Sequence, residues 1–219
     1  MTYSVTLSKK LQKVLRLPHL SDSRKMGCAN GKSALTEDDL EFIATHTAVT
    51  REEVDAQYES FLRKHPDGQI SRKEFSALMR QCYPNADTDK LEKHIFRMYD
   101  SNQDGFIDFR EFMIVLYIMS SGSPEENLHQ IFKVFDINND GAISMRELKR
   151  IVKDLFHLLS PEDNPEQASK SAMASMAFKE MDTNSDGKVT REEFVKAIMG
   201  QEKFSSKLAL KIVDVFITE

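Results

Sequence analysis

Three stretches of this chain carry oxygen-bearing side chains at one repeated spacing. Each has Asp first, Asn third, Asp fifth, Gly sixth, a polar residue ninth and Glu twelfth. The side chains are Asp100, Asn102, Asp104, Asp108 and Glu111; Asp136, Asn138, Asp140, Ser144 and Glu147; and Asp182, Asn184, Asp186, Thr190 and Glu193. The seventh residues, Phe106, Ala142 and Lys188, would each add a backbone carbonyl. Because Ca²⁺ prefers about six to eight hard oxygen ligands, the spacing predicts three calcium ions bound per chain.

This spacing is that of the EF-hand calcium loop, in which the sixth-place glycine allows the sharp turn toward the ion. The ninth residue stands three places before the glutamate, which is the spacing of a capping box at a helix start. The apolar eighth residues, Ile107, Ile143 and Val189, should point away from the ion. We expect them to join the loops in pairs through short β-bridges.

Residues 63–74 form a fourth, damaged copy of the loop. Arg63 and His65 stand where oxygen donors should be, and Pro66 fixes φ inside the segment that must wrap the ion. Cationic groups at these positions should repel Ca²⁺. We therefore interpret this first hand as a structural partner whose eighth residue, Ile70, pairs with its counterpart in the second hand.

The sixth-place glycines, Gly68, Gly105, Gly141 and Gly187, recur at intervals of 37, 36 and 46 residues, so the chain is an internal repeat. The predicted fold is all-α, with four EF-hands paired into two lobes, a degenerate first hand and short β-bridges between paired loops. A short helix-breaking run at 120–124 separates the lobes. The expected units are a basic extension at 1–25, an N-lobe at 26–120, and a C-lobe at 121–219 that includes a C-terminal helix.

Composition excludes several other classes of protein. The 219 residues are 40% hydrophobic and 30% charged, and the net charge of -5 argues against a nucleic-acid partner. Cys28 and Cys82 are too few for a disulfide framework, and no apolar run reaches the roughly 18 residues that cross a bilayer. No cluster of residues has the character of a catalytic site. We expect a non-enzymatic cytoplasmic protein, monomeric or weakly dimeric, with a membrane-associated form.

The segments between loops repeat apolar residues at helical spacing, and the chain has 11 Met and 14 Phe but no Trp. Soft apolar side chains of this kind line the grooves that calcium opens in sensor EF-hands. Core packing is the alternative explanation for the same residues. The candidates for such a groove in the N-lobe are Tyr58, Phe61, Phe75, Met79 and Tyr83.

The order of these parts resembles the recoverin and neuronal calcium sensor family, which includes visinin-like, neurocalcin-like and frequenin-like proteins. The resemblance covers residues 26–219 and is carried by the damaged first loop and by the stretches 83–87, 104–112 and 181–187. It implies a regulatory sensor that binds calcium at the second to fourth hands. An N-lobe groove would then open toward a membrane or toward a receptor, channel or signalling enzyme.

Departures from the family pattern leave the target open. Gln57 stands where many relatives have Trp, Ala86 replaces a frequent Gly, and residues 63–65 differ from the usual sequence. A cytosolic calcium buffer and a dedicated ion-channel subunit remain as alternative functions.

The amino-terminal region carries a second signal, at Met26, Gly27 and Cys28. It resembles a myristoylated start with a palmitoylation site, and it can act only if the chain begins at Met26. Residues 1–25 hold six Lys and Arg against one acid, with an apolar helical stripe. This segment predicts an amphipathic membrane-binding helix, a disordered extension or a mitochondrial presequence. At the other end, residues 208–216 predict a helix that either packs on the core or plugs the groove.

Overall fold

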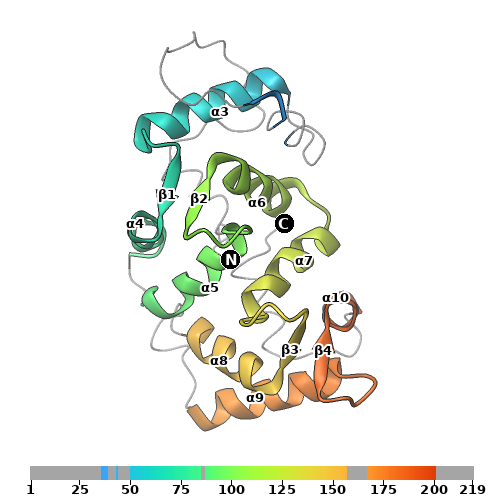
Figure 1. The fold of residues 1–219 in the computed structure, drawn as a ribbon. Coiled ribbons are helices and arrows are strands. Elements are labelled where there is room, and N and C mark those ends of the chain that lie inside the picture. The colour runs from blue at the N-terminus through green and yellow to red at the C-terminus, as the bar shows by residue number, and fades with distance from the viewer. Residues whose placement is uncertain (1–35, 39–42, 44–49, 85–86, 157–166, 201–219) are drawn as a thin grey trace, which may run out of the picture.

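A computed structural model describes residues 36–38, 43, 50–84, 87–156 and 167–200. The amino-terminal extension, Gly27, Cys28 and the predicted helix at 208–216 lie outside the described residues. Along the rest of the chain, each short strand lies between two helices (Figure 1). The elements are α3 (Arg51–Lys64), β1 (Gln69–Ser71), α4 (Arg72–Cys82), α5 (Asp89–Tyr99), β2 (Phe106–Asp108), α6 (Phe109–Ser121), α7 (Pro124–Phe135), β3 (Ala142–Ser144), α8 (Met145–Leu155), α9 (Gln167–Met181), β4 (Lys188–Thr190) and α10 (Arg191–Met199).

Each hand is a helix, a loop that ends in a three-residue strand, and a second helix. The strands pair antiparallel, β1 with β2 and β3 with β4. Ile70 lies opposite Ile107, and Ile143 lies opposite Val189, with all four side chains fully buried. The prediction of an all-α fold of four EF-hands in two lobes, joined by β-bridges between eighth-place residues, is confirmed.

Capping boxes start the second helix of every hand. Asp108 accepts a hydrogen bond from the amide of Glu111, whose carboxylate accepts in turn from the amide of Asp108. The same reciprocal bonds begin α8 and α10, and also α4 of the degenerate hand. The capping box therefore holds the twelfth-place glutamate where the loop ends.

The break between the second and third hands is only two residues long. α6 ends at Ser121, and α7 begins at Pro124 with Ser123 as its cap. A Cβ on Gly122 would lie 2.5 Å from the carbonyl oxygen of Ile118, so the backbone makes this turn at a distance that only glycine tolerates. The sequence signal at 120–124 thus marks a real end of a helix.

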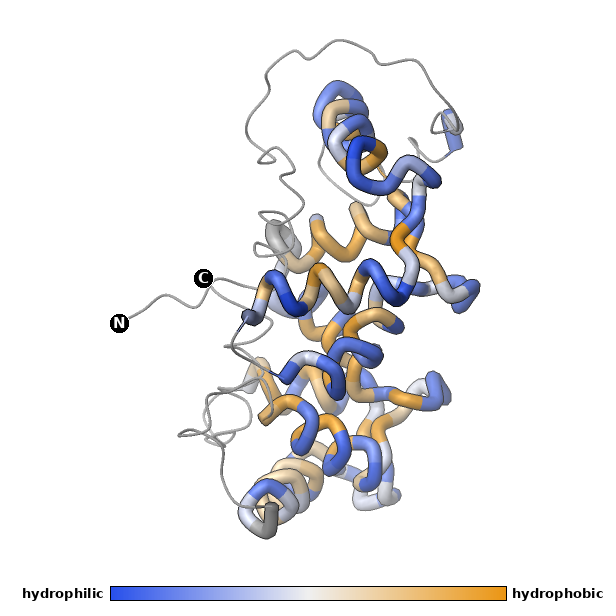
Figure 2. Tube along the Cα trace, turned by 90° about the vertical axis from the view of Figure 1, so that its left-hand side faces the viewer, coloured by the Kyte–Doolittle hydropathy of each residue, from blue (hydrophilic) through white to orange (hydrophobic). Residues whose placement is uncertain are grey.

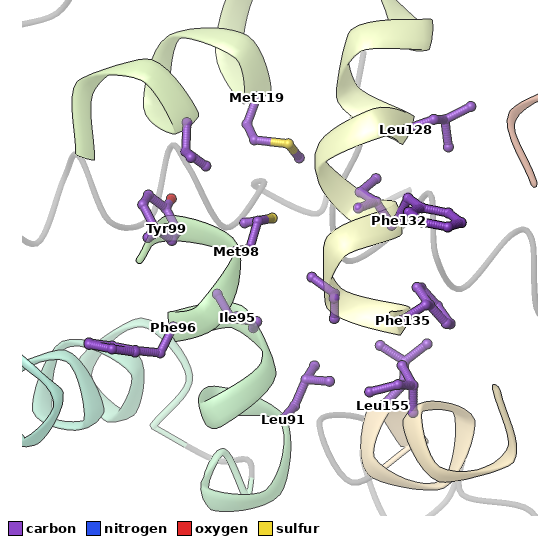
Figure 3. Close-up of a cluster of buried hydrophobic side chains, with 14 of the residues drawn as sticks. Leu91, Ile95, Phe96, Met98, Tyr99, Met119, Leu128, Phe132, Phe135 and Leu155 are labelled. Carbon is purple, nitrogen blue, oxygen red and sulfur yellow. The ribbon is translucent and has the colours of Figure 1, made fainter. Parts of the chain in front are cut away.

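Buried apolar side chains form a single cluster that runs through both pairs of hands. In Figure 2, hydrophobic segments lie mainly toward the interior and hydrophilic segments mainly toward solvent. Side chains of α5, including Leu91 and Ile95, lie opposite α7 and α8 (Figure 3). The second and third hands therefore share one core. Within the described residues, no helix has the length and hydrophobicity to span a membrane.

Candidate calcium sites

The second loop already gathers its predicted ligands by internal hydrogen bonds. Asp100 accepts from the amides of Asp104 at 3.1 Å and Gly105 at 3.2 Å. The Oδ1 atom of Asn102 accepts from the Asp104 amide at 2.9 Å, and Asp104 accepts from the amide of Phe106 at 2.9 Å. These bonds turn the side-chain oxygens of the first, third and fifth positions toward the inside of the loop.

The third and fourth loops repeat this arrangement. Their first-position carboxylates each accept from the amides of the fifth and sixth residues. The third-position asparagines accept from the fifth-position amide at 3.2 Å and 3.0 Å. Three loops of different sequence therefore adopt one backbone path, which is what a common ligand would require.

The twelfth-position glutamate crosses each loop to reach its beginning. Oε1 of Glu111 accepts from the amides of Ser101 at 2.9 Å and Asn102 at 3.1 Å. The corresponding glutamates of the third and fourth loops make the same type of contact. The carboxylate from the second helix of a hand thus lies beside the ligands that follow the first helix. This donor set fits a calcium ion held between the two helices.

Within the described residues, no three acidic, histidine or cysteine side chains gather closely enough to hold a metal by themselves. Each predicted ligand set contains at least three acidic side chains, to which an asparagine oxygen and a backbone carbonyl would be added. The backbone hydrogen bonds shape each loop, and the carboxylates would have to move closer together to hold an ion.

The carboxylates of the second and fourth sites differ in their affinity for protons. Burial raises the pKa of Asp100 and of Glu111. Burial also acts to raise the pKa of Glu193, but hydrogen bonds from Thr190 and Thr183 outweigh it and lower this pKa to about 2. These hydrogen bonds therefore keep the Glu193 carboxylate anionic.

The complete loops share a backbone feature that the sequence analysis did not identify. Their fourth residues, Gln103, Asn139 and Ser185, have positive φ values of 61°, 56° and 59°. Non-glycine residues adopt this conformation only uncommonly. Asn and Ser at this place were only a weak signal of the positive φ, because the position supplies no predicted ligand and its residue type varies from loop to loop.

Pro66 occupies this fourth position in the first loop. The proline ring holds φ near about -65°, so the first loop cannot take the backbone path of the other three. The sixth-place glycine still has a φ of 77°, and the β1 pairing is intact. The first hand therefore keeps the glycine turn and the strand pairing of the motif but lacks the fourth-position conformation that the other three loops share.

His65 of the first loop departs from the expectation that it repels calcium as a cation. Burial lowers its pKa and favours the neutral ring. Its Nδ1 atom lies 3.3 Å from Oε1 of Glu74. Arg63 turns away from the loop and donates to Ser60. The missing oxygen donors and the proline, rather than repulsion by His65, are therefore the basis for predicting that this loop binds no calcium.

The groove candidates lie in the interior of the N-lobe or at its edge. Phe61, Phe75 and Met79 are fully buried, whereas Tyr58 and Tyr83 are half-buried. α3 lies apart from the other labelled helices in Figure 1. Its aromatic rings reach α6, with 4.9 Å between the ring centroids of Tyr58 and Phe109 and 5.3 Å between those of Phe61 and Phe109. These side chains form core contacts in this structure.

Comparisons with known proteins agree with the loop geometry. The EF-hand domain pair family matches residues 125–199, and the EF hand domain family matches residues 93–119. Human recoverin is 31% identical over 179 residues, which cover 80% of this chain and 90% of recoverin. The chain belongs to the recoverin and neuronal calcium sensor family.

Other relatives have similar coverage. S-modulin of Aquarana catesbeiana is 33% identical over 180 residues, covering 78% of this chain and 87% of S-modulin. Neuronal calcium sensor 1 of Aplysia californica is 37% identical over 169 residues, covering 75% and 87% respectively. The chain therefore carries EF-hand calcium-binding domains, and its similarity to these relatives extends over most of their length.

Proposed function

We propose that this protein is a non-enzymatic calcium sensor that binds three Ca²⁺ ions, at the second, third and fourth hands. The observation that carries the proposal is the shared geometry of three loops, each with its twelfth-position glutamate hydrogen-bonded to the loop's opening residues. The first hand supports the second through the contact between Ile70 and Ile107. Its neutral His65 and its Pro66 take no part in binding an ion.

In this proposal, calcium changes the angle between the helices of a hand and exposes the N-lobe groove. Phe61, Phe75 and Met79 are buried side chains that such a movement would uncover. The exposed surface would bind a protein target such as a receptor, a channel or a signalling enzyme. The presence of neuronal calcium sensor 1 among the relatives favours the sensor over the calcium buffer and the dedicated channel subunit.

A membrane surface is the second proposed partner. The basic extension at 1–25 would attract anionic lipids, and a chain that begins at Met26 would offer Gly27 for myristoylation and Cys28 for palmitoylation. The proposed location is therefore the cytoplasm, with a fraction held at the membrane. The proposed units remain 1–25, 26–120 and 121–219.

Calcium-dependent binding to a hydrophobic resin tests the sensor proposal against the buffer alternative. A sensor should be retained with calcium and released by a chelator, because only an opened hand presents apolar surface. Retention that is equal in both conditions would favour the buffer. Isothermal titration calorimetry should find three ions per chain.

A further inference from the structure

Arg97 of α5 connects the second hand to the third. Its Nη2 atom donates to the backbone carbonyl oxygens of Lys133 at 3.2 Å, Val134 at 3.0 Å and Asp136 at 3.3 Å. Lys133 and Val134 lie in the last turn of α7, and Asp136 is the first residue of the third calcium loop. A side chain of the second hand thus contacts the exact point at which the third loop begins to wrap its ion.

The last carbonyls of a helix have no partner within the helix, and the C-terminal end of the helix dipole attracts cations. The half-buried guanidinium of Arg97 donates to these carbonyls and places a positive charge at the C-terminal end of α7. Burial lowers the pKa of Arg97, while the carboxylates of Asp136 and Glu147 oppose this effect. Arg97 therefore places a positive charge beside the backbone from which the third loop begins.

His94 extends the same contact to the other helix of the third hand. Nη1 of Arg97 lies 3.2 Å from Nδ1 of His94, and Nε2 of His94 lies 3.2 Å from Oδ2 of Asp154. A guanidinium can only donate, so Nδ1 accepts and the proton of the neutral ring is on Nε2. His94 consequently donates to Asp154, which is on α8, and the ring is only 1% exposed.

α7 and α8 are the two helices of the third hand, so Arg97 and His94 hold both of them from one face of α5. The same helix also makes apolar contacts, since Leu91 and Ile95 lie opposite α7 and α8 in Figure 3. α5 itself ends one residue before Asp100, the first ligand of the second site. The same short helix thus meets the second site at its end and the third hand along its side.

We propose that Arg97 and His94 form an inter-lobe clamp that couples calcium binding at the second and third sites. This inference rests on the proposed function, because it requires both loops to bind calcium. When an ion at the second site fixes the end of α5, the clamp would favour the arrangement of α7 and α8 that binds an ion at the third site. Coupling of this kind is reciprocal, so an ion at the third site should strengthen the second site by the same factor.

Backbone amides that report on each loop separately can test the inter-lobe clamp. Gly105, Gly141 and Gly187 each donate to the first ligand of their own loop, at 3.2 Å, 2.9 Å and 3.0 Å. Their NMR signals should follow calcium at the second, third and fourth sites during a titration of the full chain. In the parent background, Glu111→Gln disables the second site and should weaken the third, read at Gly141, by about fivefold or more.

The same comparison in an Arg97→Met background gives the decisive result. There, Glu111→Gln should change the midpoint at Gly141 by less than about twofold, because the link between the sites is gone. Lys90→Met is the matched control, since it removes a cation from an exposed pair on the same helix and should leave the coupling unchanged. An unchanged effect of Glu111→Gln in the Arg97→Met background would overturn the clamp.

Arg97→Lys tests the inter-lobe clamp instead if the Arg97→Met variant does not fold. It keeps the positive charge but lacks the planar fork in which Nη2 contacts the α7 carbonyls while Nη1 contacts His94, so coupling should again be lost. Full coupling in folded Arg97→Lys would overturn the clamp in favour of charge alone. Calcium-responsive glycine signals without coupling in the parent would refute the clamp but not the proposed function. Signals that do not respond to calcium at all would refute the proposed function itself.

Discussion

The Nδ1 atom of His65 lies 3.3 Å from Oε1 of Glu74, so the third and twelfth positions of the first loop contact each other directly. In the complete loops these positions hold an asparagine and a glutamate, both predicted to be calcium ligands. Hydrogen bonds from Ser71 lower the pKa of Glu74 and keep it anionic. The first loop is therefore closed by its own side chains, without a cation.

We predict that ligand replacement alone will not restore the first site. Arg63→Asp with His65→Asn supplies oxygens at the first and third positions but leaves Pro66, whose φ cannot become positive. Adding Pro66→Asn allows the conformation seen at Asn139 of the third loop. Calorimetry should count three ions for the double variant, as for the parent, and four for the triple variant. A fourth ion in the double variant would show that the proline is not the obstacle.

Loss of the twelfth-position carboxylate should remove one ion at a time. Glu111→Gln, Glu147→Gln and Glu193→Gln each replace an oxygen ligand and a charge, so affinity should fall from the sensor range of about 10⁻⁷ to 10⁻⁵ M to about 10⁻⁴ M or weaker. Each variant should bind two ions with sensor affinity in calorimetry. Glu192→Gln is the matched control, because this exposed neighbour is not a ligand. Three tight ions in any of the first three variants would exclude its glutamate as a ligand.

The parts of the fold that depend on local spacing could be predicted from the sequence. The twelve-residue pattern predicts the ligands, and the serine, threonine or aspartate in the ninth place both starts a helix and positions Glu111 and its counterparts. The pairing of Ile70 with Ile107 could be predicted because the strand residues occupy the same place in every loop. These features repeat along the chain, and repetition is visible without a structure.

Contacts between residues that occupy different places in their respective hands could not be predicted in this way. Arg97 reaches carbonyls 36 to 39 residues away, and which face of α5 meets α7 is decided by the packing of both hands. The neutral state of His65 depends on burial, which its sequence neighbours do not show. Positive φ at Gln103 was missed because a residue that provides no ligand carries little sequence signal.

Calcium should expose apolar surface in the N-lobe if the sensor proposal is correct. An environment-sensitive dye should fluoresce more strongly with the calcium form, because Phe61, Phe75 and Met79 leave the interior when the hands open. Glu111→Gln should reduce this response more than Glu193→Gln does, since Glu111 belongs to the N-lobe. Glu192→Gln should respond as the parent does. A parent response that is the same with calcium and with chelator would support the buffer instead.

The two proposed amino termini should bind membranes by different forces. A chain that begins at Met1 has six cations within residues 1–25, so its binding to vesicles with anionic lipid should decline steeply as salt screens the charges. A chain that begins at Gly27 with a myristoyl group should be less sensitive to salt and should bind more firmly if Cys28 is also palmitoylated. Vesicle sedimentation across a salt series, with and without calcium, compares them. If neither form sediments in any condition, the membrane half of the proposal fails.

His94 should make the stability of the calcium-free protein depend on pH. Burial lowers its pKa below the unfolded value of about 6.5, an effect that Arg97 and Lys93 reinforce and the carboxylate of Asp154 opposes. Well above pH 6.5 the ring is neutral in both states. As the pH falls below 6.5, the unfolded chain takes up a proton that the folded chain does not, so the free energy of unfolding decreases.

The decrease should reach at most about 1.4 kcal/mol per pH unit for this one histidine. His65 is buried with a lowered pKa as well, so it should contribute in the same direction. Urea unfolding of calcium-free protein between pH 7.5 and 5.5 should show a shallower pH dependence in His94→Gln than in the parent, and the shallowest in the double variant with His65→Gln. If His94→Gln keeps the parent's slope, His94 does not stay neutral in the folded state, and the assignment of its proton to Nε2 is wrong.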